Sequence, residues 1–349
     1  MSSPRPLAFV TLLCCSSTML ALTARAQDAR RSLDLTVNHV GVSIGDSREV
    51  TGLRLNFRDT RLERVDGINL TVWKPAKSSH GRVRGLALGL PYTGGASILG
   101  LAAGVGIAAE ETLGGISVAL VGSGGGSSIR GIHAAGIGVG SGGDVRGIAV
   151  GGIGIGAGGS LRGLMIGGIG AGAGGSARGI VIGGIGAAAG GSLQGIAIGG
   201  IGVGAGGNSR GLIIGGIGAG IGGDFEGIAI GGIGVGAGGT MRGLAIGGIG
   251  VGAPKIRGIA LGGVGVGGAD LHGVFLSLVS VKATDNGVVS GLAVSAYNDA
   301  RKGTQRGLMI GLVNIADQLH GVQLGLVNIV RGNPAGRRVL PIANWNFAR

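Results

Sequence analysis

Glycine and apolar residues alternate through the middle of this chain in a unit of sixteen residues, which repeats almost unchanged from residue 131 to residue 258. Numbered from its first glycine, the unit has apolar side chains at positions 2, 4, 7, 9 and 11, and often at position 15. A spacing of two residues is typical of β-strands, so the pattern predicts an array of short strands. In the unit that begins at Gly147 the apolar residues are Ile148, Val150, Ile153, Ile155, Ala157 and Leu161.

Glycines divide each unit into segments. The step from position 4 to position 7 breaks the alternation, which predicts a turn near Gly151 and Gly152, and the stretch 158–160 predicts another. The glycine at position 1 suits a corner that needs a positive φ or close packing. Degenerate copies extend the array in both directions, with first glycines at 52, 67, 85, 100, 115, 131, 147, 163, 179, 195, 211, 227, 243, 258, 273, 291, 307 and 321.

Two all-β architectures fit this pattern. In a β-solenoid of about 18 rungs of 14–18 residues, the segments at positions 2–4 and 7–11 point Ile and Val inward, and rungs stack about 4.8 Å apart. In the alternative, Gly151-Gly152 is a hairpin turn and the units form a meander or a β-barrel. Transmembrane barrel strands need about 9–11 residues, more than half a unit supplies, so we favour the solenoid.

The array fills residues 52–335 without a linker, between a lead-in or cap at 27–51 and a closing segment at 336–349. Residues 1–26 have the form of a signal peptide, with a basic Arg5, an apolar stretch and an Ala24-Arg25-Ala26 cleavage site. We therefore expect export to the periplasm, the outer membrane or the cell surface of a Gram-negative bacterium.

The residue before the first glycine of a unit is often arginine, and the chain carries a formal net charge of +13. Guanidinium groups bind phosphates and carboxylates in a bidentate manner. We expect an anion-binding rim for an envelope glycan or lipid head groups, with a merely solubilising charged face as the alternative. Nucleic acid is disfavoured because only 3% of residues are aromatic. The rim residues are Arg130, Arg146, Arg162, Arg178, Arg210, Arg242 and Arg257.

The sequence offers no arrangement typical of a catalytic site. The motif G-x-G-x-x-G recurs in most units as a result of composition, whereas a dinucleotide site needs one copy between a strand and a helix. Both cysteines, Cys14 and Cys15, lie within the signal segment. We expect no enzyme activity, no cofactor and no metal site.

The C-terminal units 307–315 and 321–329 read G-L-M-I-G-L-V-N-I and G-V-Q-L-G-L-V-N-I. They resemble the G-[VLI]-x-[IL]-G-L-[VI]-N-I repeats of a bacterial surface-repeat protein family known from spirochaetes and other Gram-negative bacteria, and residues 340–347 resemble its closing segment. The resemblance implies an exported, surface-associated structural or interaction protein without known catalysis. Trp345 and Phe347 also resemble the aromatic ending of outer-membrane barrel proteins, which leaves an outer-membrane β-barrel component as the alternative.

Overall fold

A computed structural model describes residues 32–73, 75 and 81–347 of the chain. The expected signal peptide, residues 1–26, lies outside the described residues. The chain divides into two compact units, Met1–Arg130 and Gly131–Arg349. The described part of the chain contains no helix long and apolar enough to span a membrane.

Consecutive repeats pair with each other in parallel, at a register of one unit. Arg162 pairs with Arg146 on one side and with Arg178 on the other, and Gly163 pairs with Gly147 and Gly179. The fold is a β-solenoid of about 17 turns, as the periodicity predicts. The alternative of hairpins in a meander or a β-barrel is wrong, because hairpins would pair antiparallel strands within one unit, whereas these strands pair with the units before and after.

The first unit begins with an antiparallel pair and continues with parallel strands. Strand β1 runs antiparallel to β2, and β2, β3, β4 and β5 then pair in parallel in chain order. The bounds are β1 Ser32–Val37, β2 Val40–Gly45, β3 Glu49–Asn56, β4 Arg64–Thr71 and β5 Arg82–Gly125, and β6 covers Ser128–Ala135.

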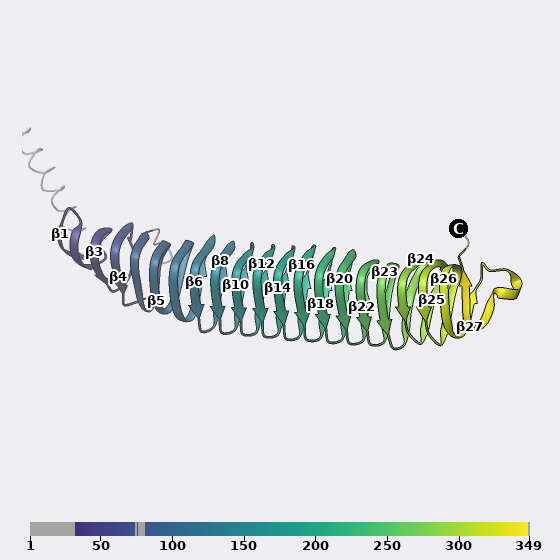
Figure 1. Cartoon of the computed structure of the whole chain (residues 1–349). Helices are drawn as coiled ribbons and strands as arrows, with labels where there is room; N and C mark the ends of the chain where they lie inside the picture. Colours follow the sequence, from purple (N-terminus) through teal and green to yellow (C-terminus); the bar gives the residue numbers. More distant parts are fainter. Residues whose placement is uncertain (1–31, 74, 76–80, 348–349) are drawn as a thin grey trace, which may run out of the picture. The chain divides into compact units, whose positions relative to one another are not determined.

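The second unit consists mainly of turns with one long and one short strand, and its long strands lie side by side (Figure 1). The long strands are β8 Asp144–Gly151, β10 Leu161–Gly167, β12 Ala177–Gly183, β14 Leu193–Gly199, β16 Ser209–Gly215, β18 Phe225–Gly231, β20 Thr240–Gly247 and β22 Lys255–Gly262. The short strands are β7 Gly138–Ser141, β9 Gly154–Ala157, β11 Gly170–Ala173, β13 Gly186–Ala189, β15 Gly202–Ala205, β17 Gly218–Ile221, β19 Gly234–Ala237 and β21 Gly250–Gly252.

Longer strands close the second unit. They are β23 Gly265–Ser277, β24 Ser280–Val294, β25 Tyr297–Ile310 and β26 Val313–Val330, which pair in parallel in chain order. A short 3-10 helix, η2 Ala335–Arg337, precedes β27 Val339–Asn346, which runs antiparallel to β26.

The interior differs from the expected one. Ile155, Ala157 and Leu161, at positions 9, 11 and 15, are buried as predicted. The prediction for positions 2, 4 and 7 is wrong, because Ile148 and Val150 are each 40% exposed and Ile153 is 49% exposed.

The physical reason is strand parity. The long strand begins at position 15, so its inward side carries positions 15, 3 and 5, and positions 2 and 4 face outward. The inward residue at position 3 is the small Ala149, which is fully buried. A Cβ on Gly151, at position 5, would lie 2.2 Å from the carbonyl oxygen of Gly154 on the short strand. Only glycine therefore fits at position 5 of this repeat, beside the turn, whereas position 3 also accepts a large side chain, such as the fully buried Met165 of the next repeat.

The glycine at position 1 has the conformation that the sequence predicts. All eighteen first glycines have a positive φ, from 102° to 153°. At Gly163, where φ is 120°, a Cβ would lie 2.0 Å from the carbonyl oxygen of Gly147. Both the conformation and the space require glycine at this position, which lies within the long strand and not at a corner.

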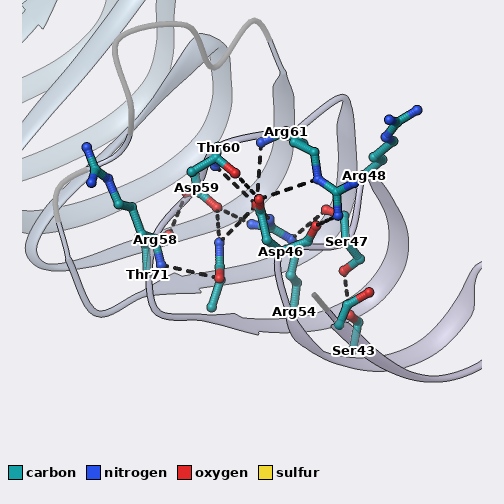
Figure 2. Close-up of polar contacts among 12 residues, drawn as sticks. Ser43, Asp46, Ser47, Arg48, Arg54, Arg58, Asp59, Thr60, Arg61 and Thr71 are labelled. Carbon is teal, nitrogen blue, oxygen red and sulfur yellow. Dashed lines mark hydrogen bonds and ion pairs between the residues drawn. The ribbon is translucent and has the colours of Figure 1, made fainter. Parts of the chain in front are cut away.

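Polar side chains fill the interior near the start of the first unit (Figure 2). Arg54 is fully buried, and its guanidinium contacts Asp59, the Oδ1 of Asp46 at 3.1 Å and the Oδ1 of Asn69 at 2.9 Å. Burial alone would raise the pKa of Asp46, but hydrogen bonds from Thr60 and the charge of Arg54 outweigh it and hold this pKa below its ordinary value of 3.8. The buried charge is thus paired and hydrogen-bonded, as its cost requires.

Candidate functional site: an arginine row beside an aliphatic face

Six of the seven arginines expected to form the rim lie in the second unit, one per turn and directly above one another in the parallel register. We call these six the arginine row. All six are exposed, and Gln194 and Glu226 take the arginine position in the two turns that interrupt the row. Arg130 is exposed too but belongs to the first unit. The row consists of Arg146, Arg162, Arg178, Arg210, Arg242 and Arg257.

Two members of the row have acidic partners. Arg146 contacts Asp144 at 2.7 Å, and Arg210 contacts Glu226 at 3.0 Å. The backbone amide of Ser160, followed by the guanidinium of Arg146, holds the pKa of Asp144 below its ordinary value. Three other members of the row, Arg178, Arg242 and Arg257, form no ion pair with any described residue. Much of the positive charge is therefore available to a partner.

The arginines share a side of the long strands with large aliphatic residues. On β10, Leu161 and Met165 are buried, whereas Arg162, Leu164 and Ile166 are not. Every long strand from β8 to β22 repeats this arrangement, with an Ile, Leu or Val at positions 2 and 4 that is half-buried or exposed. We call these side chains the aliphatic face: Ile148, Val150, Leu164, Ile166, Ile180, Ile182, Ile196, Ile198, Leu212, Ile214, Ile228, Ile230, Leu244, Ile246, Ile259 and Leu261.

A shallow apolar groove of about 450 Å³ continues the aliphatic face toward the C-terminal turns. Its walls include Ile246, Leu261, Leu276, Leu278 and Val294, and glycines form part of its floor. The groove lies at the ends of the long strands that are remote from the arginines.

A second apolar column stands at the corner between long and short strands. It consists of the isoleucines at position 7, and each is about half exposed although its backbone amide bonds to the preceding turn, as from Ile169 to the carbonyl of Ile153 at 2.7 Å. We call it the corner row: Ile153, Ile169, Ile185, Ile201, Ile217, Ile233 and Ile249.

The sequence located the arginines but missed the aliphatic face. The available signal was the apolar residue at position 15, because a strand that passes through the glycine at position 1 puts positions 15 and 3 on one side. The expectations that the protein has no enzyme activity and no metal site remain predictions. In the described residues no group of three His, Cys, Asp or Glu side chains is placed to hold a metal ion.

No protein-family model, no curated protein and no solved structure matches this chain. The surface-repeat family that residues 307–347 resemble therefore stays a prediction. The residues of that resemblance do have a defined structural setting, because Asn314 and Asn328 are both buried in the last turns.

Proposed function

We propose that the protein is an exported, non-catalytic repeat protein of the bacterial envelope, which acts by presenting an extended outer surface to a polyanionic partner. A β-solenoid fits a repeat structural or surface protein. The observation that carries the proposal is the arginine row, in which the parallel register holds exposed guanidinium groups one above another. A partner with repeated phosphates or carboxylates matches such a row.

The repetition explains how weak contacts give useful binding. A single exposed ion pair contributes little in water, typically under about 1 kcal/mol. Several contacts made by one rigid surface to one polymer or one sheet of head groups act together, because each contact holds the next at a high local concentration. Binding of this kind falls steeply as salt rises, since the interactions are screened.

Export is tested with residues 1–26 fused to a reporter enzyme that is active only outside the cytoplasm. The apolar stretch should carry the reporter across the inner membrane. The control replaces Leu12 and Leu13 with arginine, which breaks that stretch. Reporter activity equal in the fusion and its control would overturn the exported location.

Recognition by the arginine row is tested with purified protein and isolated envelope fragments. Changing Arg146, Arg162, Arg178 and Arg210 to Ser should weaken salt-sensitive sedimentation with the fragments at least tenfold. A matched control removes the same charge elsewhere, at the exposed residues Arg58, Arg84, Arg331 and Arg337. Equal loss in both variants would mean that net charge, rather than the row, is responsible.

A further inference from the structure

The outer side of the long strands combines a charged edge with an apolar surface. Arg162 comes two residues before Leu164 and four before Ile166 on β10, and the pattern Arg-x-Leu-x-Ile recurs with Arg242 on β20. From β8 to β22 the aliphatic side chains repeat at every turn and the arginines at all but two, so the basic edge and the aliphatic face run parallel. A partner that fits both must offer negative charge beside an apolar layer.

The backbone beneath this surface has its hydrogen bonds within the sheet. β10 pairs in parallel with β8 on one side and with β12 on the other, and the long strands from β12 to β20 are likewise paired on both sides. A sheet face of this kind can meet an apolar medium without exposing unpaired amide or carbonyl groups. The aliphatic face is therefore compatible with lipid as well as with water.

The charge of the edge favours anionic head groups. The arginine row carries six positive charges against the single carboxylate of Glu226 at the same strand position, and Arg178, Arg242 and Arg257 form no ion pair in the described part of the chain. An anionic glycan would use the charge and leave the aliphatic side chains in water. A bilayer of anionic phospholipids uses both, which is the combination that holds amphipathic segments at a membrane surface.

The apolar groove provides room for an acyl chain at the far side of the face. Arg257 and Leu261, a wall residue of the groove, are four residues apart on β22, or about 13 Å along an extended strand. A phospholipid with its phosphate at the arginine row can therefore extend a chain over Ile259 toward the groove.

We infer that the aliphatic face and the arginine row together bind the surface of an anionic phospholipid bilayer. The inference deepens the proposed function and rests on it for the biological setting. The arginines contact phosphates, and the aliphatic side chains enter the layer between head groups and acyl chains. The short strands, with glycine at most of their outward positions, face away from the lipid.

Flotation of the purified protein with vesicles tests the inference. One set of vesicles contains phosphatidylcholine alone and the other contains phosphatidylcholine with phosphatidylglycerol. The face variant carries Leu164→Thr, Ile180→Thr and Ile196→Thr, and the matched corner variant carries Ile169→Thr, Ile185→Thr and Ile201→Thr. The row variant carries Arg162→Ser, Arg178→Ser, Arg242→Ser and Arg257→Ser. All proteins share one N-terminus, so any binding by residues 1–26 cancels.

The parent protein should float with the anionic vesicles and remain at the bottom with the neutral ones. The row variant should bind about fivefold more weakly for each arginine removed, and the face variant at least tenfold more weakly, whereas the corner variant should bind like the parent. Equal binding by the face variant and the parent would overturn the inference, as would equal losses in the face and corner variants. Equal affinity of the parent for a soluble carboxylated polysaccharide would also overturn it, because that partner has no apolar layer.

Fluorescence gives a second readout that does not depend on losing affinity. Ile180→Trp places a reporter on the aliphatic face, and Ile185→Trp places one in the corner row of the same turn. Anionic vesicles should shift the emission of the first variant to shorter wavelength and leave the emission of the second unchanged. Trp73 and Trp345 contribute equally to both variants, so the difference between their spectra comes from the introduced tryptophan. An unchanged spectrum for Ile180→Trp would refute insertion of the face. Failure here with successful export of the reporter would overturn lipid binding alone, and failed export would overturn the proposed function.

Discussion

Asn298 donates a hydrogen bond of 2.7 Å from its Nδ2 to the Oδ1 of Asn314, which lies directly beside it in the next turn. Asn314 in turn donates one of 2.7 Å to the Oδ1 of Asn328, and all three side chains are fully buried. The amides thus form a ladder that crosses the last turns of the second unit. This ladder gives a structural reason for the asparagine of the C-terminal repeats, since a buried amide is stable only when its donors and acceptors are paired.

Removing the middle amide should destabilise these turns. Asn314→Ala deprives Asn328 of a donor and Asn298 of an acceptor, and leaves the carbonyl of Leu324 without its side-chain partner. We expect a loss of about 2–4 kcal/mol in the free energy of unfolding, measured by urea titration. The control Gln318→Ala, at an exposed position of the same strand, should change it little. Similar values for the two variants would show that the ladder contributes no stability.

Glycines of the repeat should differ sharply in their tolerance of a methyl group. Gly179 has a φ of 113°, and a Cβ there would lie 2.2 Å from the carbonyl oxygen of Gly163, whereas a Cβ on Gly172 would have no heavy atom within 4 Å. Gly179→Ala should cost about 3 kcal/mol or more, because strain and overlap add. Gly172→Ala should be neutral or slightly stabilising through the unfolded chain. Thermal unfolding of both variants followed by circular dichroism checks this contrast.

The periodicity of the chain predicted the solenoid, its turns and the positive φ of the first glycine of each repeat, because each of these follows from spacing alone. The direction of the side chains was harder to predict. The apolar pattern predicts that the large aliphatic residues at positions 2, 4 and 7 lie in the interior, because such residues are usually buried. Those at positions 2 and 4 face outward because the long strand runs from position 15 through the glycine at position 1, which puts positions 15, 3 and 5 on its inward side. Whether a strand continues through a glycine depends on its pairing with the neighbouring turns, which the apolar spacing does not show.

The polar interior of the first unit follows the same parity rule. Arg54 and Asn69 stand at position 3 of the repeats that begin at Gly52 and Gly67, and Asn56 and Thr71 stand at position 5. All four therefore face inward and are buried. Their distance from the first glycine of the repeat therefore predicts that these four side chains lie inside. The charge of Arg54 hid this, since an arginine is rarely buried without partners. Its partner Asp59 lies outside the strands, where no spacing rule applies.

The reversal of inside and outside has a direct test in two neighbouring apolar residues of one turn. Met165 is fully buried at position 3, and Ile169 is about half exposed in the corner row. Met165→Ala should lower the free energy of unfolding by about 2–5 kcal/mol, since it leaves a cavity. Ile169→Ala should lower it by no more than about 1 kcal/mol. Urea titration of the two variants measures these losses. A larger loss for Ile169→Ala than for Met165→Ala would mean that position 7, and not position 3, faces the interior.

Acid should weaken the first unit through Asp46. Because the folded protein holds the pKa of this carboxyl below 3.8 through Thr60 and Arg54, the unfolded chain takes up the proton first as the pH falls. The stabilisation is thus fully present above the ordinary pKa and is lost as the pH falls from about 5 toward the lowered value. Asp46→Asn should be less stable than the parent at pH 7, and the difference should shrink at pH 3. Urea midpoints measured at pH 7, 5, 4 and 3 show this, and a difference that stays constant with pH would exclude the charge of Asp46 as its source.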